Sequence, residues 1–212
     1  MHALDSRYLN LTNYFAHRFT TAGTFSYGLS PLPSFLVEPD RAEDELNIVV
    51  RPERGAEQQQ QHDVVVSRAD DGVTARPGRL EIALGDVVGW STDGTLTTGF
   101  AVRGRIGDTT VDSSAMTDES IFTHAFGSPG EYRWADAHGS TLYGTVQVVR
   151  PEPGDERHAG WTAELGRGTL VHVTGERAEP ETVEILVGQT VFWAVQRAPG
   201  ISITDVTLLR GR

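Results

Sequence analysis

The sequence contains no cysteine and no lysine, and it has no apolar run long enough to cross a membrane. Without cysteine the protein has no disulfide bond, no thiolate metal ligand and no cysteine nucleophile. A membrane-spanning helix needs about 20 consecutive apolar residues, so the sequence predicts no membrane span. No pattern of a signal peptide is visible, which predicts a cytoplasmic location. A mature exported chain that carried an added initiator methionine would look the same, so an extracellular location stays open.

The charge is strongly one-sided. The chain has 29 acidic and 18 basic residues, a net charge of −11, and every basic residue is an arginine. The arginines are scattered among acidic residues and form no basic patch, which excludes nucleic acid as an expected partner. An acidic chain without lysine or cysteine resembles proteins of salt-loving archaea. The alternative is an acidic protein from a GC-rich bacterium.

Short apolar segments rich in β-branched and aromatic residues predict an all-β fold. Glycine, proline, aspartate and serine separate these segments at regular intervals, a pattern typical of a β-sandwich or small barrel. No segment shows a long apolar period of 3.6 residues, so no long helix is expected. The predicted strands are residues 63–67, 79–84, 86–90, 99–102, 131–134 and 144–149.

Several blocks of sequence recur in the same order about 100 residues later, which predicts an internal duplication. The offset between matching blocks is 107, 99 or 103 residues. The matching blocks are 3–6 and 110–113, 15–25 and 122–132, 49–55 and 148–154, 80–90 and 183–193, and 102–105 and 209–212.

The repeat is out of phase with the chain, because the last residue matches Arg105 and the first matches Asp108. Neither terminal half-module can bury its apolar face alone. We therefore expect the two halves to pair, and a high effective concentration favours pairing within one chain over exchange between chains. The predicted organisation is a continuous module at 62–150, an assembled module of 1–52 plus 165–212, and linkers at 53–61 and 151–164.

The residues of the middle module resemble a known family. Residues 119–134, followed by His138 and residues 143–149, are similar to the second half of halocyanins and plastocyanins. Residues 80–90 and the turn at 111–113 are similar to the first half. This resemblance implies that each module is a cupredoxin-like Greek-key β-sandwich, in a duplicated and circularly permuted arrangement.

Cupredoxins usually bind copper through two histidines, a cysteine and a weak axial methionine. Carried onto this chain, the first histidine falls near residues 97–100, where no histidine stands. The cysteine falls near Ala135 or Asp136, the second histidine matches His138, and the methionine falls near Leu142. We therefore expect no cofactor and no metal. A remnant copper or zinc site formed by His138 and Asp136 is the alternative.

Two other features complete the candidate residues. His17 and His124 occupy equivalent positions of the repeat, and the resemblance implies a structural role for both. The first copy also has an insertion, which could cover the end of its own module or form a contact surface. The apolar residues of this insertion are Leu32, Phe35, Leu36 and Val37.

No catalytic motif is visible. The sequence has no Gly-x-Ser-x-Gly turn, no phosphate-binding loop and no His-Glu-x-x-His segment, so we expect no enzyme. A metal-free duplicated sandwich with an apolar insertion predicts a self-assembling structural or interaction protein, present as a homo-oligomer or polymer. A copper-handling or electron-transfer protein related to halocyanin is the alternative function.

Overall fold

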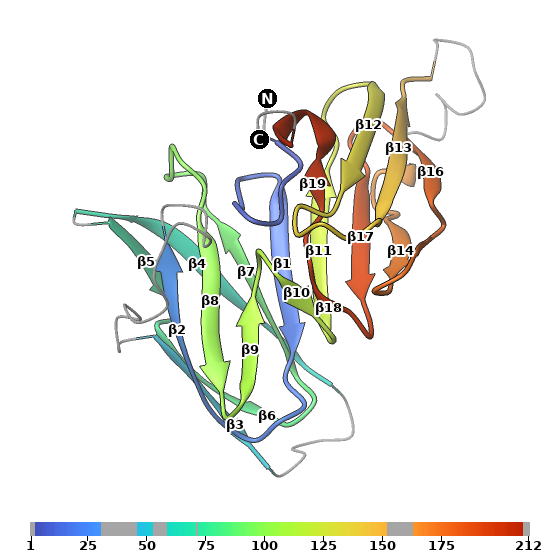
Figure 1. Cartoon of the computed structure of the whole chain (residues 1–212). Coiled ribbons are helices and arrows are strands. Elements are labelled where there is room, and N and C mark those ends of the chain that lie inside the picture. Colours follow the sequence, from blue (N-terminus) through green and yellow to red (C-terminus); the bar gives the residue numbers. More distant parts are fainter. Residues whose placement is uncertain (1–2, 31–45, 53–58, 71, 152–162, 210–212) are drawn as a thin grey trace.

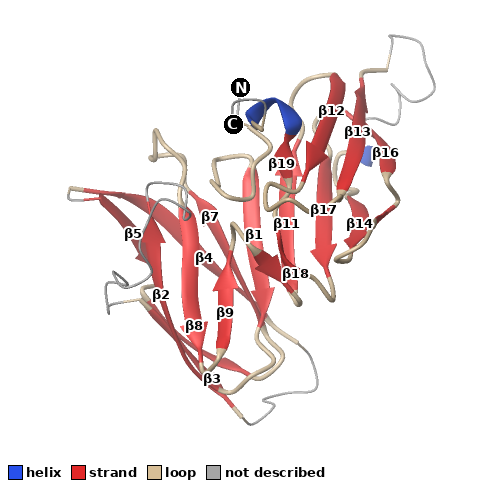
Figure 2. Ribbon diagram, viewed as in Figure 1, coloured by secondary structure: helices blue, strands red, loops and turns tan. Residues whose placement is uncertain are grey.

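The computed structural model describes residues 3–30, 46–52, 59–70, 72–151 and 163–209. The regular secondary structure of this part of the chain is almost entirely β-strand, which confirms the all-β prediction (Figures 1 and 2). Its strands form two layers. One layer is a continuous eight-stranded sheet, and the other consists of a five-stranded and a four-stranded sheet.

The strand order follows from the hydrogen-bonded neighbours. The eight-stranded sheet runs β15 (Ala178–Glu179), β14 (Thr169–Val173), β17 (Thr190–Val195), β11 (Ser120–Ala125), β1 (Asn13–Arg18), β7 (Val87–Thr92), β4 (Gln61–Ala69) and β5 (Gly72–Arg76). The five-stranded sheet runs β6 (Arg79–Ala83), β3 (Asn47–Arg51), β2 (Gly23–Ser30), β8 (Ala101–Ile106) and β9 (Thr109–Asp112). The four-stranded sheet runs β16 (Thr182–Leu186), β13 (Tyr143–Val149), β12 (Gly130–Ala135) and β19 (Thr204–Asp205). A short pair joins β10 (Met116–Thr117) to β18 (Pro199–Ile201), and a 3-10 turn, η2 (Val206–Leu208), follows β19.

Each small sheet packs on one half of the long sheet through buried aromatic rings. In the first half, the ring of Tyr27 on β2 lies 5.7 Å from that of Trp90 on β7. In the second half, the ring of Trp134 on β12 lies 6.2 Å from that of Trp193 on β17. We call β1 to β9 the N-terminal sandwich and β10 to β19 the C-terminal sandwich. Both Trp90 and Trp193 are fully buried, and they end the matching blocks 80–90 and 183–193, so equivalent positions of the repeat lie in the cores of both sandwiches.

The two sandwiches meet at equivalent strands. Strand β1 pairs antiparallel with β11, and Phe15 lies opposite Phe122, its own counterpart in the repeat. Asn13 lies opposite His124, and His17 lies opposite Ser120, so the register is symmetric about the Phe15–Phe122 pair. The duplicated sequence therefore folds as two copies related by a pseudo-two-fold axis, which resembles an isologous dimer joined within one chain.

The predicted assembly of one module from the two ends of the chain is wrong. Strand β3 pairs with β6 and β2 pairs with β8, so segment 1–52 completes its sandwich with residues 61–112. The predicted continuous module, 62–150, is divided between the two sandwiches. Repeat matching identifies equivalent halves but cannot tell which copies pair. The halves that actually pair are joined by a short connection, which gives the smaller loop-closure cost.

Segments near the two ends of the chain do contact each other, through the short stretch that contains Asp5 and Ser6. Ser6 and Ile203 exchange two hydrogen bonds: the Ser6 N–H donates to the Ile203 carbonyl at 2.9 Å, and the Ile203 N–H donates to the Ser6 hydroxyl at 3.0 Å. Ser113 and Val102 form the same pair of bonds at 3.0 and 3.2 Å. Each copy thus extends its Asp-Ser segment onto the other sandwich.

The strand register also shows that the last sequence match, 102–105 with 209–212, is wrong. Tyr27 pairs with Gly104, and its counterpart Trp134 pairs with Asp205. The structural offset at this strand is therefore 101 residues, and the similarity of residues 102–105 to 209–212 does not reflect equivalent positions. Within the described residues, no helix is long and apolar enough to cross a membrane.

Candidate functional site

The predicted remnant metal ligands both have structural partners. The Nε2 atom of His138 donates to the carbonyl oxygen of Ser114 at 2.6 Å. One carboxylate oxygen of Asp136 accepts the Ser202 N–H at 2.8 Å, and the other accepts the Ser140 N–H at 3.2 Å. Burial alone would raise the pKa of Asp136, but these backbone hydrogen bonds outweigh it and lower the pKa. The two side chains therefore tie loops together at one end of the C-terminal sandwich.

The described residues contain no group of three or more histidine, aspartate and glutamate side chains placed to hold a metal ion. The predicted contact residues Leu32, Phe35, Leu36 and Val37 lie outside the described part of the chain. Their role in a contact stays a prediction.

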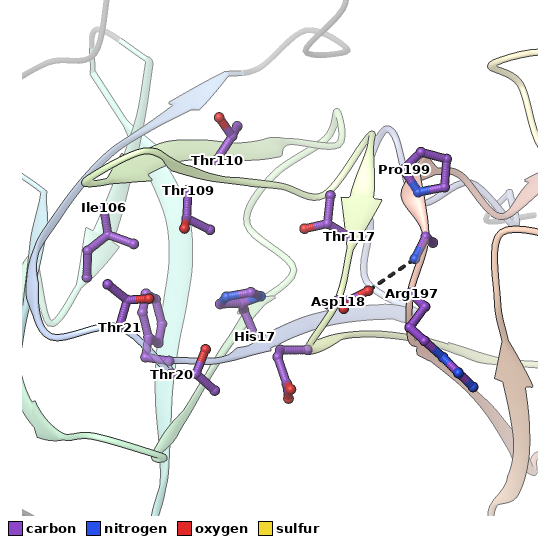
Figure 3. A pocket seen from close by; sticks show the side chains of 13 residues that line it. His17, Thr20, Thr21, Ile106, Thr109, Thr110, Thr117, Asp118, Arg197 and Pro199 are labelled. Carbon is purple, nitrogen blue, oxygen red and sulfur yellow. Dashed lines mark hydrogen bonds between the residues drawn. The ribbon is translucent and has the colours of Figure 1, made fainter.

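A cleft of about 610 Å³ lies where the two sandwiches join, next to His17 (Figure 3). The N-terminal sandwich contributes the end of β1 and the β8–β9 hairpin. The C-terminal sandwich contributes the turn between β10 and β11 and the connection from β17 to β18. Its lining residues are His17, Phe19, Thr20, Thr21, Ile106, Thr109, Thr110, Thr117, Asp118, Glu119, Arg197, Ala198 and Pro199.

His17 is held in place at the base of the cleft. Its Nδ1 atom lies 3.3 Å from the hydroxyl of Ser120 on β11, and its ring packs edge-on against Phe19 at 5.1 Å. Only 5% of His17 is exposed, and burial lowers its pKa from 6.5 to about 4. The imidazole is therefore neutral at neutral pH, when it can both donate and accept a hydrogen bond.

Two residues of the cleft have unusual backbone conformations. Glu119 has a φ of 69° and Arg197 has a φ of 50°, and these are the two non-glycine residues with positive φ among those described. Residues other than glycine adopt this region at a cost in energy, and such residues gather at functional sites. Glu119 is fixed by Arg18, whose Nε lies 2.6 Å from a carboxylate oxygen of Glu119. The hydrogen bond from Arg18 lowers the pKa of Glu119.

The opposite wall is also fixed by a hydrogen bond. One carboxylate oxygen of Asp118 accepts the N–H of Ala198 at 3.0 Å, which joins the β10–β11 turn to the connection after β17 (Figure 3). This contact holds Asp118 and Arg197 on the same side of the cleft, opposite the β8–β9 hairpin. The walls therefore come from both copies of the repeat.

The pseudo-two-fold counterpart of this site has different residues. His124 is the counterpart of His17, and the Nδ2 atom of Asn13 contacts its Nδ1 atom at 2.8 Å. The counterparts of Thr117, Asp118 and Glu119 are Asn10, Leu11 and Thr12. The two sides therefore share a buried histidine but differ in charge and in hydrogen-bonding groups.

A second candidate site lies on the outer face of the eight-stranded sheet. Leu170 on β14 lies opposite Phe192 on β17, and 48% and 38% of these two residues are exposed. The equivalent positions of the N-terminal sandwich are Asp63 and Gly89. There the hydroxyl of Tyr14 donates to Asp63 at 2.7 Å, and its ring lies directly over Gly89.

Sequence reasoning identified the equivalence of His17 and His124 but not the cleft. The lining residues come from four separate segments, and their convergence depends on how the two copies pair. The whole chain has no match among protein-family models, curated proteins or solved structures.

Proposed function

We propose that this chain is a non-catalytic structural or interaction protein that assembles with further copies of itself. It would use a metal-free sandwich fold of the cupredoxin type, as the resemblance in sequence implies. The observation that carries the proposal is the exposed pair Leu170 and Phe192 on the outer face of the C-terminal sandwich. Large apolar side chains that lie side by side on a surface are typical of contact sites.

A second copy is the partner that the sheet geometry favours. Two sheets that pack face to face lie about 10 Å apart, and side chains from both fill the space between them. On the outer face of β14 and β17, the exposed pair Leu170 and Phe192 supplies apolar side chains for such a contact. Leu170 and Phe192 occupy directly paired positions of this face. The same two residues of a second copy would complete a symmetric contact.

The charge of the chain sets the condition for assembly. Two copies that each carry −11 repel one another in dilute buffer. The screening length falls from about 10 Å at 0.1 M salt to about 3 Å at 1 M. We therefore expect association to increase with salt, because the apolar contact gains once the repulsion is screened.

Light scattering in molar KCl tests the proposal. The wild type should give a mass above that of one chain, and Leu170→Asp combined with Phe192→Thr should reduce it to a monomer. The matched control is Leu208→Asp, because 46% of Leu208 is exposed away from this face. The control should assemble as the wild type does.

Thermal unfolding would show whether the double variant still folds. A folded double variant that assembles like the wild type would refute the role of this face. A wild type that remains a monomer at high protein concentration in molar salt would refute self-assembly itself.

A further inference from the structure

The cleft beside His17 is rich in hydroxyl groups. Figure 3 shows threonines on both walls, with Thr109 of the β8–β9 hairpin on the same side of the ribbon as Thr117, which precedes Asp118. A threonine hydroxyl donates one hydrogen bond and accepts others, so it matches another hydroxyl equally well in either role. The threonines that line the cleft are Thr20, Thr21, Thr109, Thr110 and Thr117.

The cleft also has apolar surface between these hydroxyls. Phe19, Ile106 and Pro199 line it together with the threonine methyl groups. A ligand that fits such a lining carries hydroxyls at its edge and C–H groups on its face. Sugars have this combination, and a volume of about 610 Å³ lies within the usual range for small-molecule sites.

The charges around the cleft balance. The carboxylate of Asp118 and the guanidinium of Arg197 lie on the same wall, and Glu119 is paired with Arg18. His17 adds no charge, because it is neutral at neutral pH. A neutral ligand therefore meets a strong acceptor in Asp118, whose charge is balanced by Arg197 on the same wall, without the penalty of burying an unpaired charge.

His17 offers a further group to a ligand. Its Nδ1 atom is engaged by Ser120, whereas its Nε2 atom makes no hydrogen bond to any of the residues that the structure describes. A neutral imidazole nitrogen donates or accepts according to the tautomer, so Nε2 matches a ligand hydroxyl in either role. His17 lines the cleft, and Figure 3 shows its ring close to Thr109 and Thr117 of the two walls.

From these observations we infer that the cleft is a binding site for a neutral, hydroxyl-rich small molecule of the saccharide class. His17 and the threonines bind ligand hydroxyls, Asp118 orients them, and Phe19 with Ile106 contacts the C–H face. This inference does not depend on self-assembly, because the cleft lies at the junction of the two copies and not on the outer face near Leu170.

Titration of the full-length chain with neutral sugars, followed by amide chemical shifts, tests the inference. The probes are glucose, galactose, mannose, maltose and lactose. At least one should cause saturable shifts confined to the cleft, with a dissociation constant of about 1 mM or below. Glucuronate and glucosamine should bind more weakly than the neutral sugar of the same size, because each brings an unpaired charge.

The variant Thr109→Val combined with Thr117→Val keeps the shape of the lining and removes one hydroxyl from each wall. It should weaken binding at least about tenfold, because two hydroxyl partners are lost. The control Thr24→Val changes an exposed threonine on β2 outside the cleft and should bind like the wild type.

Three results would overturn the inference. They are no saturable shift with any neutral sugar, tighter binding of a charged probe than of its neutral counterpart, and unchanged affinity in the double variant. The control removes one hydroxyl and the variant removes two, so thermal unfolding of both shows whether a loss of binding reflects a loss of stability.

Discussion

The two sandwiches have equivalent buried cores but carry different types of residue on their outer faces. In the N-terminal sandwich, the outer face carries Asp63 and Gly89, and Tyr14 covers the glycine while its hydroxyl donates to the aspartate. In the C-terminal sandwich, the same positions carry Leu170 and Phe192, which are exposed. The two copies therefore have equivalent interiors and differ on the outer face, which is polar in one copy and apolar in the other.

The same comparison holds at the junction of the copies. The buried histidines 17 and 124 each pack edge-on against a phenylalanine, at 5.1 and 4.6 Å. Near His17, the paired strand β11 is preceded by the acidic residues Asp118 and Glu119. Near His124, the equivalent positions hold Leu11 and Thr12, which carry no charge. The buried scaffold tolerates little change because it is closely packed, so the copies diverge where side chains meet solvent.

The largest effect should come from the shared core. Replacing either fully buried tryptophan, Trp90→Ala or Trp193→Ala, should lower the free energy of unfolding by about 3–5 kcal/mol. Denaturant unfolding measures both. Similar losses would show that the two interiors are equivalent. A loss below about 1 kcal/mol in one copy would contradict that equivalence.

The next effect is a change in the free energy of unfolding with pH, which depends on His17. The pKa of His17 falls from 6.5 in the unfolded chain to about 4 in the folded one, so the native state binds the proton less well. Its contribution to stability is complete above pH 6.5 and is lost as the pH falls towards 4, by up to about 3 kcal/mol. Stability measured from pH 7 to 4 should fall less steeply in His17→Gln. An unchanged slope in the variant would contradict the account of His17.

The smallest effect concerns the polar outer face. Tyr14→Phe removes the 2.7 Å hydrogen bond to Asp63. Since this bond is partly exposed, we expect a loss of only about 0.5–1.5 kcal/mol. Burial and the neighbouring Asp63 raise the pKa of Tyr14, so the bond persists into alkaline solution. Thermal unfolding of the variant should show a small shift, and a gain in stability would contradict the role of this bond.

The sequence predicted those features that depend on local pattern. Alternating apolar residues predicted the strands, and matching blocks predicted the equivalence of Trp90 with Trp193. The pairing of half-modules was wrong, because two copies of one repeat offer equally good partners to each half. The block 102–105 suggested a wrong phase for the repeat. Its apparent counterpart, 209–212, follows β19, and β19 is the strand equivalent to β8.

The candidate cleft could not be predicted for the same reason. Its walls meet only because β1 pairs with β11, and no local pattern specifies that pairing. Two signals were present in the sequence, the equivalent histidines and the run Thr117-Asp118-Glu119, but nothing placed them beside Thr109 on the hairpin. The predicted ligands His138 and Asp136 were visible as residue types, whereas their hydrogen bonds to loop backbone were not.

The central claim is that segment 1–52 completes its sandwich with residues 61–112, and paired cysteines test it most directly. Ser26 on β2 lies opposite Arg105 on β8, and both are exposed. Antiparallel partners have Cα atoms about 4.5–5.5 Å apart, within the range of a disulfide bond. If the ends of the chain paired instead, Val206 would stand opposite Ser26, because Trp134, the counterpart of Tyr27, pairs with Asp205.

The chain has no native cysteine, so each engineered pair can be read without interference. After mild oxidation of dilute protein, mass spectrometry of proteolytic fragments should find an intramolecular disulfide in Ser26→Cys with Arg105→Cys. The pair Ser26→Cys with Val206→Cys should remain reduced. A disulfide in the second pair and none in the first would contradict the fold on which both proposed sites depend.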